Sequence, residues 1–338
     1  MIKKELKNKS ILITGGTGSF GKTVVARILK YHAKIKKLVV LSRDELKQFE
    51  MSKTFTNKKY PKIRFLIGDI RDKDRLNRAM KDIDIVIHAA ALKQVDTAEY
   101  NPFEYIQTNV VGAQNLIESA LDNNVSNLIA LSTDKAVSPI NLYGATKLCA
   151  DKLFIAANNI KGKRKIKFSV VRYGNVFGSR GSVIPIFLSI KSGDAYPITD
   201  INMTRFNISL NEAVDQVFWS LKNNVGGEIF VPKIPSYRIL DLVKSIKSNF
   251  KYRVIGIRSG EKIHEELISK ADSQNTYDLK SCYSIIDKSN YIAKQKYKNK
   301  KYLKVKQGFE YNSSNNKKFL TVNELKKLIS IYKKENNL

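Results

Sequence analysis

A tyrosine and a lysine four positions apart, Tyr143 and Lys147, are the side chains of this sequence best suited to carry out a reaction. On a helix, residues at this spacing share one face, so the ammonium group of the lysine can stabilise the phenolate of the tyrosine. A tyrosine with an ordinary pKa of about 10 can then act as a base near neutral pH. The pair predicts oxidation of an alcohol, with a tyrosine and a lysine on a solvated helix surface as the alternative.

The preceding segment 132–135, Ser-Thr-Asp-Lys, adds an acid and a second base that alcohol oxidation alone does not require. A ketone makes the neighbouring C–H group acidic, so Lys135 can remove that proton while Asp134 protonates a departing hydroxyl on the next carbon. Thr133 can hydrogen-bond the alcohol. We expect partial desolvation and neighbouring cations, Lys147 included, to lower the pKa of Lys135 and suit it to the base role. The segment predicts elimination of water after oxidation; a solvated loop or a local ion pair is the alternative.

Short apolar runs alternate with amphipathic segments and predict an α/β fold, a Rossmann-type doubly wound parallel sheet with a smaller C-terminal α/β substrate lobe. The expected strands of the sheet are 11–14, 37–41, 63–67, 85–88, 128–131 and 168–172. The expected helices around it are 20–31, 45–55, 73–80, 102–123 and 141–158. Residues 1–176 are expected to bind the cofactor, with later segments returning to them, and 177–338 to form mainly the substrate lobe.

In residues 177–338 the pattern of apolar and polar residues changes. Its expected helices are 183–191, 211–223, 239–248 and 321–334, and its expected strands are 228–231 and 253–257. The Lys- and Asn-rich stretch 287–301 is expected to be a solvated loop.

A glycine-rich loop, Thr-Gly-Gly-Thr-Gly-Ser-Phe-Gly at residues 14–21, follows the first expected strand and opens a helix. Glycines permit the tight turn and close approach that a dinucleotide requires, and the helix N-terminus faces its pyrophosphate. This position favours dinucleotide binding over a turn needed only for packing. The expected contacts in this loop are Gly15, Thr17, Gly18, Ser19, Phe20 and Gly21.

The end of the second expected strand distinguishes NADP from NAD. Ser42, Arg43 and Lys47 offer a hydroxyl and cations that suit a 2′-phosphate, so we expect NADP, whereas Asp44 keeps NAD open. The other expected cofactor contacts are Glu45, Asp69, Ile70, Ala89, Ala90, Ala91, Lys93, Asn109, Ser132, Tyr143, Lys147, Tyr173, Gly174 and Val176. Residues expected to hold the substrate are Lys93, Asn175, Val183, Thr204, Arg205, Arg258 and Glu261, the arginines being suited to a diphosphate.

The composition narrows the class of protein. The formal net charge of +29 raises the alternative of nucleic-acid binding, but the lysines are dispersed without an aromatic-interleaved basic stripe, so no nucleic-acid partner is expected. Two cysteines, Cys149 and Cys282, provide neither a disulfide framework nor a metal cluster, and Cys149 is expected in the core. No metal site, signal peptide or membrane span is expected, which indicates a cytoplasmic protein.

From the N-terminus to at least Glu266 the chain resembles the extended short-chain dehydrogenase/reductase superfamily, and within it the soluble, inverting UDP-N-acetylglucosamine 4,6-dehydratases. The resemblance rests on the glycine-rich loop and on residues 42–48, 88–93, 132–136 and 141–147. Arg-Tyr-Gly-Asn-Val, Met-Thr-Arg-Phe and Ile-Arg-Ser-Gly-Glu-Lys extend it, and residues 310–313 carry it close to the C-terminus. The segment 272–302 contributes nothing to the resemblance.

The resemblance implies UDP-N-acetylglucosamine as substrate, inversion at C5, tightly bound NADP recycled in each turnover, and a homo-oligomer, specifically a hexamer. It implies the first step of pseudaminic acid synthesis for flagellin glycosylation. Lys135 would be the base, Asp134 its acid partner, and Thr133, Tyr143 and Lys147 the oxidising set. Related capsule enzymes carry Met in place of this tyrosine, membrane-anchored retaining relatives carry an N-terminal membrane region, and dehydratases that retain C5 commonly show Thr-Asp-Glu.

Two alternatives of different kinds stay open. A UDP-sugar epimerase of the same superfamily needs the same cofactor and the Tyr143/Lys147 pair but has less use for Asp134 and Lys135. A non-catalytic NADP-binding regulator or nucleic-acid-binding module would account for the positive charge, but it would not need the tyrosine–lysine pair.

Overall fold

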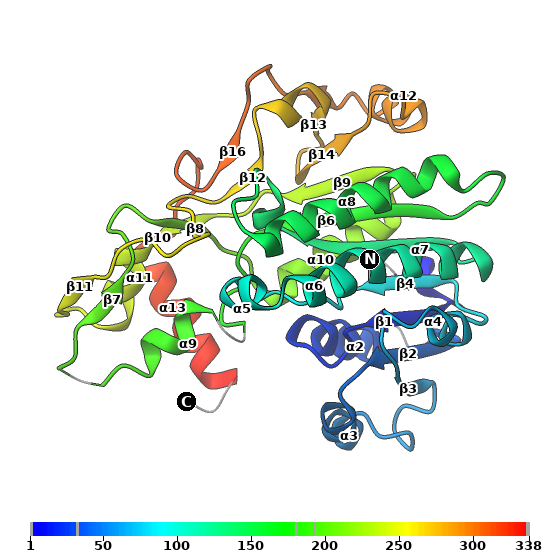
Figure 1. The fold of residues 1–338 in the computed structure, drawn as a ribbon, viewed down its shortest axis with the longest axis horizontal. Helices are drawn as coiled ribbons and strands as arrows, with labels where there is room; N and C mark the ends of the chain where they lie inside the picture. Colours follow the sequence, from blue (N-terminus) through cyan, green and yellow to red (C-terminus); the bar gives the residue numbers. More distant parts are fainter. Residues whose placement is uncertain (1–2, 32–33, 180–181, 192, 336–338) are drawn as a thin grey trace.

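A ten-stranded, mostly parallel sheet organises the computed structural model, which describes residues 3–31, 34–179, 182–191 and 193–335 (Figure 1). Its strands run in the order β15-β13-β14-β9-β6-β5-β4-β1-β2-β3. The parallel strands are β1 Ser10–Thr14, β2 Lys37–Ser42, β3 Ile63–Ile67, β4 Ile85–His88, β5 Asn127–Thr133, β6 Lys167–Tyr173 and β9 Glu228–Pro232. The predicted doubly wound α/β fold is confirmed.

Helices cover the sheet, which explains why its central strands are apolar on both sides. α8 packs on β5 and β6 beside α7, which in turn contacts α4, whereas α10 packs against α2 (Figure 1). These helices are α2 Ser19–Tyr31, α4 Lys73–Ala79, α7 Gly112–Asp122, α8 Leu142–Ile160 and α10 Leu210–Asn223. The short α1 Lys3–Leu6 precedes the sheet, and α3 Glu45–Thr54 follows β2.

The segment expected to be one helix over 102–123 is divided in the structure. α5 Val95–Tyr100 and α6 Pro102–Tyr105 come first, and a π-helical turn, Ile106–Val111, separates α6 from α7. The side-chain amide of Asn109, inside this turn, bonds both the backbone N–H and the carbonyl of Leu92. This tie to a neighbouring loop accompanies the change of helical pitch, and π-turns of this kind are frequent at functional sites.

Three antiparallel strands extend the sheet beyond β9, namely β14 Cys282–Ile286, β13 Thr276–Asp278 and β15 Leu303–Lys304. The short 3-10 turn Ala271–Asn275 leads into them. The expected solvated loop at 287–301 is wrong, because Tyr291–Asn299 forms helix α12. The side chain of Asn290 caps this helix, and the buried Tyr297 bonds the hydroxyl of Ser284 at 2.8 Å. The many lysines of α12 therefore decorate an ordered helix with a buried side.

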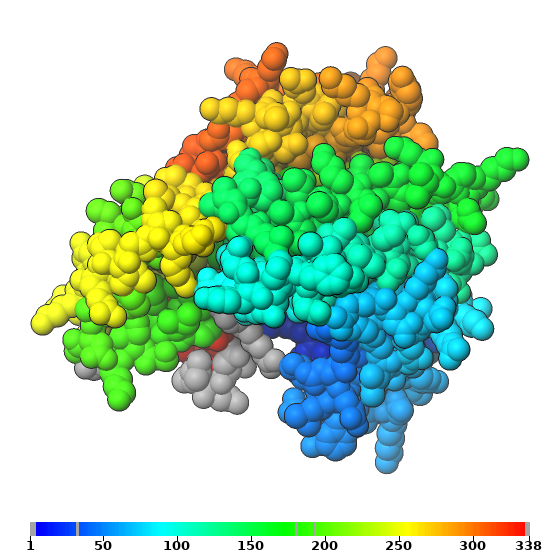
Figure 2. Space-filling view, in the orientation of Figure 1, coloured from blue at the N-terminus to red at the C-terminus, as the bar shows by residue number. Residues whose placement is uncertain are grey.

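A smaller lobe lies beside the sheet (Figures 1 and 2). It has its own apolar core. Its helices are α9 Val183–Leu188, α11 Ile239–Ile246 and α13 Val322–Glu335. Its strands pair two by two, β7 Tyr196–Ile198 with β11 Tyr252–Val254, and β8 Thr204–Phe206 with β10 Ser236–Arg238. A further pair, β12 Glu266–Ile268 with β16 Tyr311–Asn312, packs against the core of the main sheet. Most of these strands are too short to leave a period-two pattern in the sequence.

The expectation that Cys149 lies in the core is wrong. The helical period turns Lys147, Ala150 and Phe154 of α8 inward, and it leaves Cys149 exposed on the opposite side. In the described part of the chain, no helix combines the length and the apolar composition needed to cross a membrane.

Candidate active site

A cavity of about 1150 Å³ opens where the parallel strands end and the smaller lobe faces them. Ligands of α/β sheets bind at this carboxyl edge. The structure brings to the cavity wall nearly all of the residues singled out in the sequence. Those that line it are Gly15, Thr17, Gly18, Ser19, Phe20, Gly21, Ser42, Arg43, Asp44, Lys47, Asp69, Ile70, Ala89, Ala90, Ala91, Lys93, Ser132, Thr133, Asp134, Lys135, Tyr143, Lys147, Tyr173, Gly174, Asn175, Val176, Val183, Arg205, Arg258 and Glu261.

Three of the singled-out residues lie outside this wall. Glu45 is exposed in the first turn of α3. Asn109 is buried and bonds backbone groups of Leu92 and the hydroxyl of Thr146. The hydroxyl of Thr204 bonds Nδ1 of His264 at 2.8 Å. Asn109 and Thr204 thus act as supports of neighbouring segments in this structure.

The glycine-rich loop forms a cradle that fits a dinucleotide. Gly15 has a φ of +66°, and a Cβ there would lie 2.7 Å from the backbone nitrogen of Ala90. A Cβ on Gly21 would lie 2.4 Å from the Cα of Gly16, so only a glycine lets α2 start this close to the loop. Backbone N–H groups at the start of α2 are thereby available to a phosphate.

The end of β2 presents cations more openly than it presents a carboxylate. The side chain of Asp44 caps α3 by accepting the N–H of Lys47 at 2.9 Å, and it also pairs with the ammonium group of Lys47. Arg43 lies 3.6 Å from Asp69 with about half of its side chain exposed. The carboxylate of Asp44 is engaged within its own turn, whereas the guanidinium of Arg43 faces the cavity wall.

The start of α8 and the end of β5 are held together by a glycine contact. Asn141 caps α8 by accepting the N–H of Gly144 at 2.7 Å. A Cβ on Gly144 would lie 2.2 Å from the carbonyl oxygen of Lys135, so the helix packs directly on the turn Asp134–Ala136. Local capping and close packing therefore bring Tyr143 beside the Thr-Asp-Lys segment.

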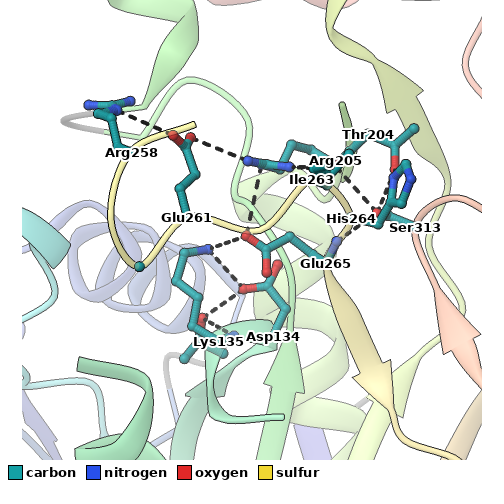
Figure 3. A network of polar contacts seen from close by, with 12 residues as sticks. Asp134, Lys135, Thr204, Arg205, Arg258, Glu261, Ile263, His264, Glu265 and Ser313 are labelled. Atoms are coloured by element: carbon teal, nitrogen blue, oxygen red, sulfur yellow. Dashed lines mark hydrogen bonds and ion pairs between the residues drawn. The ribbon is translucent and has the colours of Figure 1, made fainter. Parts of the chain in front are cut away.

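Two acidic side chains converge on Lys135 (Figure 3). Its Nζ lies 3.1 Å from Oδ1 of Asp134 and 3.1 Å from Oε1 of Glu265. Burial alone would lower the pKa of Lys135, but the two carboxylates outweigh it and raise that pKa above the ordinary lysine value. The expected lowering of this pKa is wrong, because the nearest charges are carboxylates and not cations.

The pKa of the Asp134 carboxyl group lies above its ordinary value. Burial raises its pKa and Glu265 adds to the rise, whereas Lys135 opposes both. The pKa of Glu265 moves the other way: burial would raise it, but Lys135 and Arg205 lower it below the ordinary value. The opposite shifts favour protonation of Asp134 and ionisation of Glu265.

Tyr143 and Lys147 are both buried, and groups of β5 and of the turn after it act on each of them. Burial raises the pKa of Tyr143 to about 12, and the groups that work against this rise are Lys135 and the hydroxyl of Thr133. The ammonium group of Lys147 donates to the carbonyl of Leu131 at 2.8 Å, and burial lowers its pKa. In this structure Lys135, and not Lys147, is the cation that favours the phenolate.

A buried ion pair supports the floor of the site. Arg172 of β6 lies 3.1 Å from Asp151 of α8, and both side chains are almost fully buried. The hydroxyl of Ser132 donates to the same carboxylate at 2.7 Å. These contacts hold α8, β5 and β6 in register beneath the catalytic segment.

Glu265 is the site residue that sequence reasoning missed. It also lies 3.9 Å from Nε of Arg205, whose guanidinium pairs with Glu261 at 3.4 Å (Figure 3). Arg258 in turn contacts Glu261 at 3.2 Å and Asp96 of α5 at 3.7 Å. No metal site accompanies this network, since the described residues include no cluster of His, Cys, Asp or Glu fit to hold an ion.

The sequence profile of the family described as polysaccharide biosynthesis protein matches residues 11–287. The chain belongs to this family. The match runs from the glycine-rich loop to beyond Glu265, so the cofactor cradle and the charged network both lie within the family region.

Named relatives match most of the chain. A Campylobacter jejuni protein named UDP-N-acetylglucosamine 4,6-dehydratase (inverting) is 52% identical over 95% of this chain and 97% of its own. A Rickettsia akari protein named UDP-glucose 4-epimerase is 43% identical over 95% of each chain. The X-ray structure of Pen from Bacillus thuringiensis is 38% identical, with a TM-score of 0.87 over 98% of this chain and 99% of that one.

Proposed function

We propose that this protein catalyses the redox-neutral 4,6-dehydration of UDP-N-acetylglucosamine with inversion at C5, giving UDP-2-acetamido-2,6-dideoxy-β-L-arabino-hex-4-ulose. The observation that carries the proposal is one cavity that joins a glycine cradle, an oxidising pair (Thr133 and Tyr143) and an acid–base pair (Asp134 and Lys135). The 52% identity to the Campylobacter jejuni dehydratase supports the same substrate and the same outcome at C5.

A nicotinamide dinucleotide is the cofactor that fits the cradle, and it would accept hydride from C4 and return hydride to C6. The loop 15–21 would hold its pyrophosphate, and Asp69 and Ala89–Ala91 would line its adenosine and second ribose. We infer NADP because Lys47 engages Asp44, while Arg43 and Ser42 remain at the wall as partners for a 2′-phosphate. Lys147 and Tyr173 would also contact the nicotinamide ribose.

Oxidation at C4 uses Thr133 and Tyr143. Thr133 would hydrogen-bond the 4-hydroxyl while Tyr143 takes its proton. Because burial keeps the pKa of Tyr143 at about 12, the phenolate depends on groups that lower this value, and Lys135 is the first of them. A single lysine would therefore assist the oxidation before it takes part in the elimination.

Elimination then uses Lys135 and Asp134. The neutral amine of Lys135 would take the C5 proton, and the carboxylic acid of Asp134 would give a proton to the departing C6 hydroxyl, so water leaves and a double bond forms between C5 and C6. The raised pKa of Asp134 supports its role as acid. The raised pKa of Lys135 means that its ammonium form dominates at neutral pH, so a proton must first pass to Asp134, whose oxygen lies 3.1 Å away.

Residues of the smaller lobe would hold the nucleotide sugar. Arg205 and Arg258 suit its diphosphate, and Glu261 offers an acceptor to a ribose or base hydroxyl. Lys93, Asn175 and Val183 would line the sugar. This divides the work between a cofactor-binding part, residues 1–176, and a mainly substrate-binding part, residues 177–338.

The resemblance to the inverting dehydratases is the support for the wider parts of the proposal. These are a cytoplasmic location, a homo-oligomer with six subunits as the expected form, and a place at the first step of pseudaminic acid synthesis for flagellin glycosylation. Size-exclusion chromatography with light scattering tests the oligomer independently of the reaction.

A UDP-sugar 4-epimerase is the second candidate, favoured by the 43% identity to the Rickettsia akari protein. Both reactions begin by oxidising C4 with the same tyrosine. The acid–base pair of Asp134 and Lys135 distinguishes them, because returning hydride to C4 requires no proton removal at C5. The presence of both residues at the cavity supports the dehydratase.

The experiment is incubation of the purified protein with UDP-N-acetylglucosamine in deuterated water, followed by mass spectrometry and NMR of the product. Dehydration predicts a product that has lost one water and has gained one deuterium at C5. Inversion predicts that this product has the L-arabino configuration. An intact hexose epimer without deuterium would refute the proposal in favour of the epimerase. A dehydrated product with retained C5 configuration would refute only the stereochemical part.

A further inference from the structure

Glu265 lies beside Asp134 and Lys135 but has no role in the acid–base steps described above (Figure 3). It precedes β12 and comes from a part of the chain 130 positions away from Lys135. Its Oε1 lies 3.1 Å from Nζ of Lys135 and 3.9 Å from Nε of Arg205. One carboxylate therefore bridges the catalytic lysine and an arginine of the substrate lobe.

The position of Glu265 is fixed by its backbone. Its N–H donates to the hydroxyl of Ser313 at 2.9 Å, and its carbonyl accepts the N–H of Ser313 at 2.8 Å. The side chain of Glu265 is 4% exposed and that of Asp134 is 1% exposed, whereas that of Lys135 is 24% exposed towards the cavity. All three residues line the cavity, and the side chain of the lysine is the most exposed of the three.

Each acid retains an oxygen beyond its contact with the lysine. Oδ2 of Asp134 and Oε2 of Glu265 are buried without a hydrogen-bond partner among the described residues. Other ionisable groups also act on this cluster. They are Arg205 and Lys262 near Glu265, and Lys93, Tyr143 and Tyr237, which interact with Lys135.

We propose that Glu265 is a positioning residue for the acid–base pair, which holds the ammonium group of Lys135 beside Asp134 and keeps the proton of the pair on Asp134 available for the leaving hydroxyl. The inference rests on the proposed dehydration and adds a residue to it. Glu265 itself transfers no proton and touches no reacting atom in this scheme.

The physical reason is the placement of one permanent negative charge beside the pair. Before elimination the active form has a neutral Lys135 and a protonated Asp134; afterwards Lys135 has gained the C5 proton and Asp134 has lost its proton to the departing hydroxyl. Glu265 stabilises the ammonium that this step creates. It also disfavours a second negative charge on Asp134, so it raises the pKa of both members of the pair.

The consequence is a specific pH signature. A pair that works with one shared proton gives a bell-shaped dependence of kcat on pH, limited at low pH by protonation of both groups and at high pH by loss of the shared proton. Glu265→Gln keeps the size of the side chain and removes its charge. We expect both limbs of the bell to move to lower pH by about one unit, because a buried charge in direct contact shifts proton affinity by tenfold or more.

The matched control is Glu266→Gln. Glu266 is the next residue and accepts the hydroxyl of Ser138 at 2.9 Å, so its replacement removes an equal charge from the same segment without touching an ion pair of Lys135. We expect both limbs of the pH profile of Glu266→Gln to match those of the unaltered protein. Glu265→Asp keeps the charge and should keep both limbs in place even if kcat falls. Unchanged limbs in Glu265→Gln, or the same shift in Glu266→Gln, would overturn the inference.

A second measurement does not depend on turnover. Glu265→Gln leaves the ammonium group of Lys135 with one carboxylate instead of two, so the free energy of unfolding should fall. Adding Lys135→Met to this variant should restore most of the loss. Losses that simply add in the double variant would contradict a coupling between the two residues. Failure of the unaltered protein to dehydrate UDP-N-acetylglucosamine would refute the proposed function, whereas this stability cycle tests the contact itself.

Discussion

Gly144→Ala tests whether close packing of α8 on the catalytic turn sets the geometry of the site. The added Cβ would lie 2.2 Å from the carbonyl oxygen of Lys135, about 1.2 Å inside the 3.4 Å at which ordinary contact begins. The obstructing atom belongs to the backbone, so the turn carrying Asp134 and Lys135 must move by roughly 1 Å. Misplacement of that size costs roughly a hundredfold in turnover.

We expect Gly144→Ala to lower the free energy of unfolding, although helix propensity alone would raise it. Glycine to alanine inside a helix ordinarily stabilises it by about 1 kcal/mol. Forcing a methyl group into a packed contact costs about 1–3 kcal/mol. We therefore expect Gly144→Ala to lower the free energy of unfolding by up to about 2 kcal/mol, since the clash exceeds the gain in helix propensity.

The assay pairs turnover of UDP-N-acetylglucosamine with denaturant unfolding on the same preparation. Ala156→Ser is the control, because it also adds one heavy atom to α8 but at an exposed position, and it should leave turnover unchanged. Retained turnover together with a higher free energy of unfolding in Gly144→Ala would refute the packing argument. A hundredfold loss of turnover together with the expected fall in the free energy of unfolding would support it.

Three further changes address separate parts of the site. Lys135→Ala should leave NADP bound while lowering dehydration at least hundredfold, as measured by product formation and by the cofactor content of the purified variant; normal turnover would show that another base acts. Arg43→Ala should weaken NADP about tenfold or more and leave NAD nearly unaffected in calorimetric titrations of the cofactor-free protein, and equal losses for both would argue against a 2′-phosphate contact. Asp151→Asn should lower the free energy of unfolding by about 3–5 kcal/mol, because it leaves the buried Arg172 without its nearer and more deeply buried anionic partner, and a value near zero in denaturant unfolding would contradict a structural role for the pair.

The sheet and the cradle were accessible from sequence because their determinants are local. Apolar runs such as 85–88 predict buried strands, and the glycine-rich loop lies directly after the first strand. The capped start of α8, with Tyr143 in its first turn, follows from Asn141 in the same way. Each of these features depends on neighbours within a few positions.

The charge state of Lys135 could not be predicted from the sequence, because its determinants are far apart in the chain. Its pKa is set in part by Glu265, whose contact spans 130 positions and depends on how the smaller lobe meets the sheet. The contact of Lys147 with the carbonyl of Leu131 spans 16 positions and depends on how α8 packs against β5. Helix α12 was missed because its buried side rests on few residues, Ala293 and Tyr297 among them, within a run of lysines.

The bridge through Glu265 has a consequence for how this protein can be recombined with its relatives. The lysine of the acid–base pair is encoded in the first half of the chain, but the carboxylate beside it and Arg205 are encoded in the second. A chimera joined near residue 176 would therefore take its catalytic lysine from one parent and the charge that governs this lysine from the other. Exchanging lobes between family members would therefore alter the protonation of Lys135 wherever the second parent lacks this carboxylate.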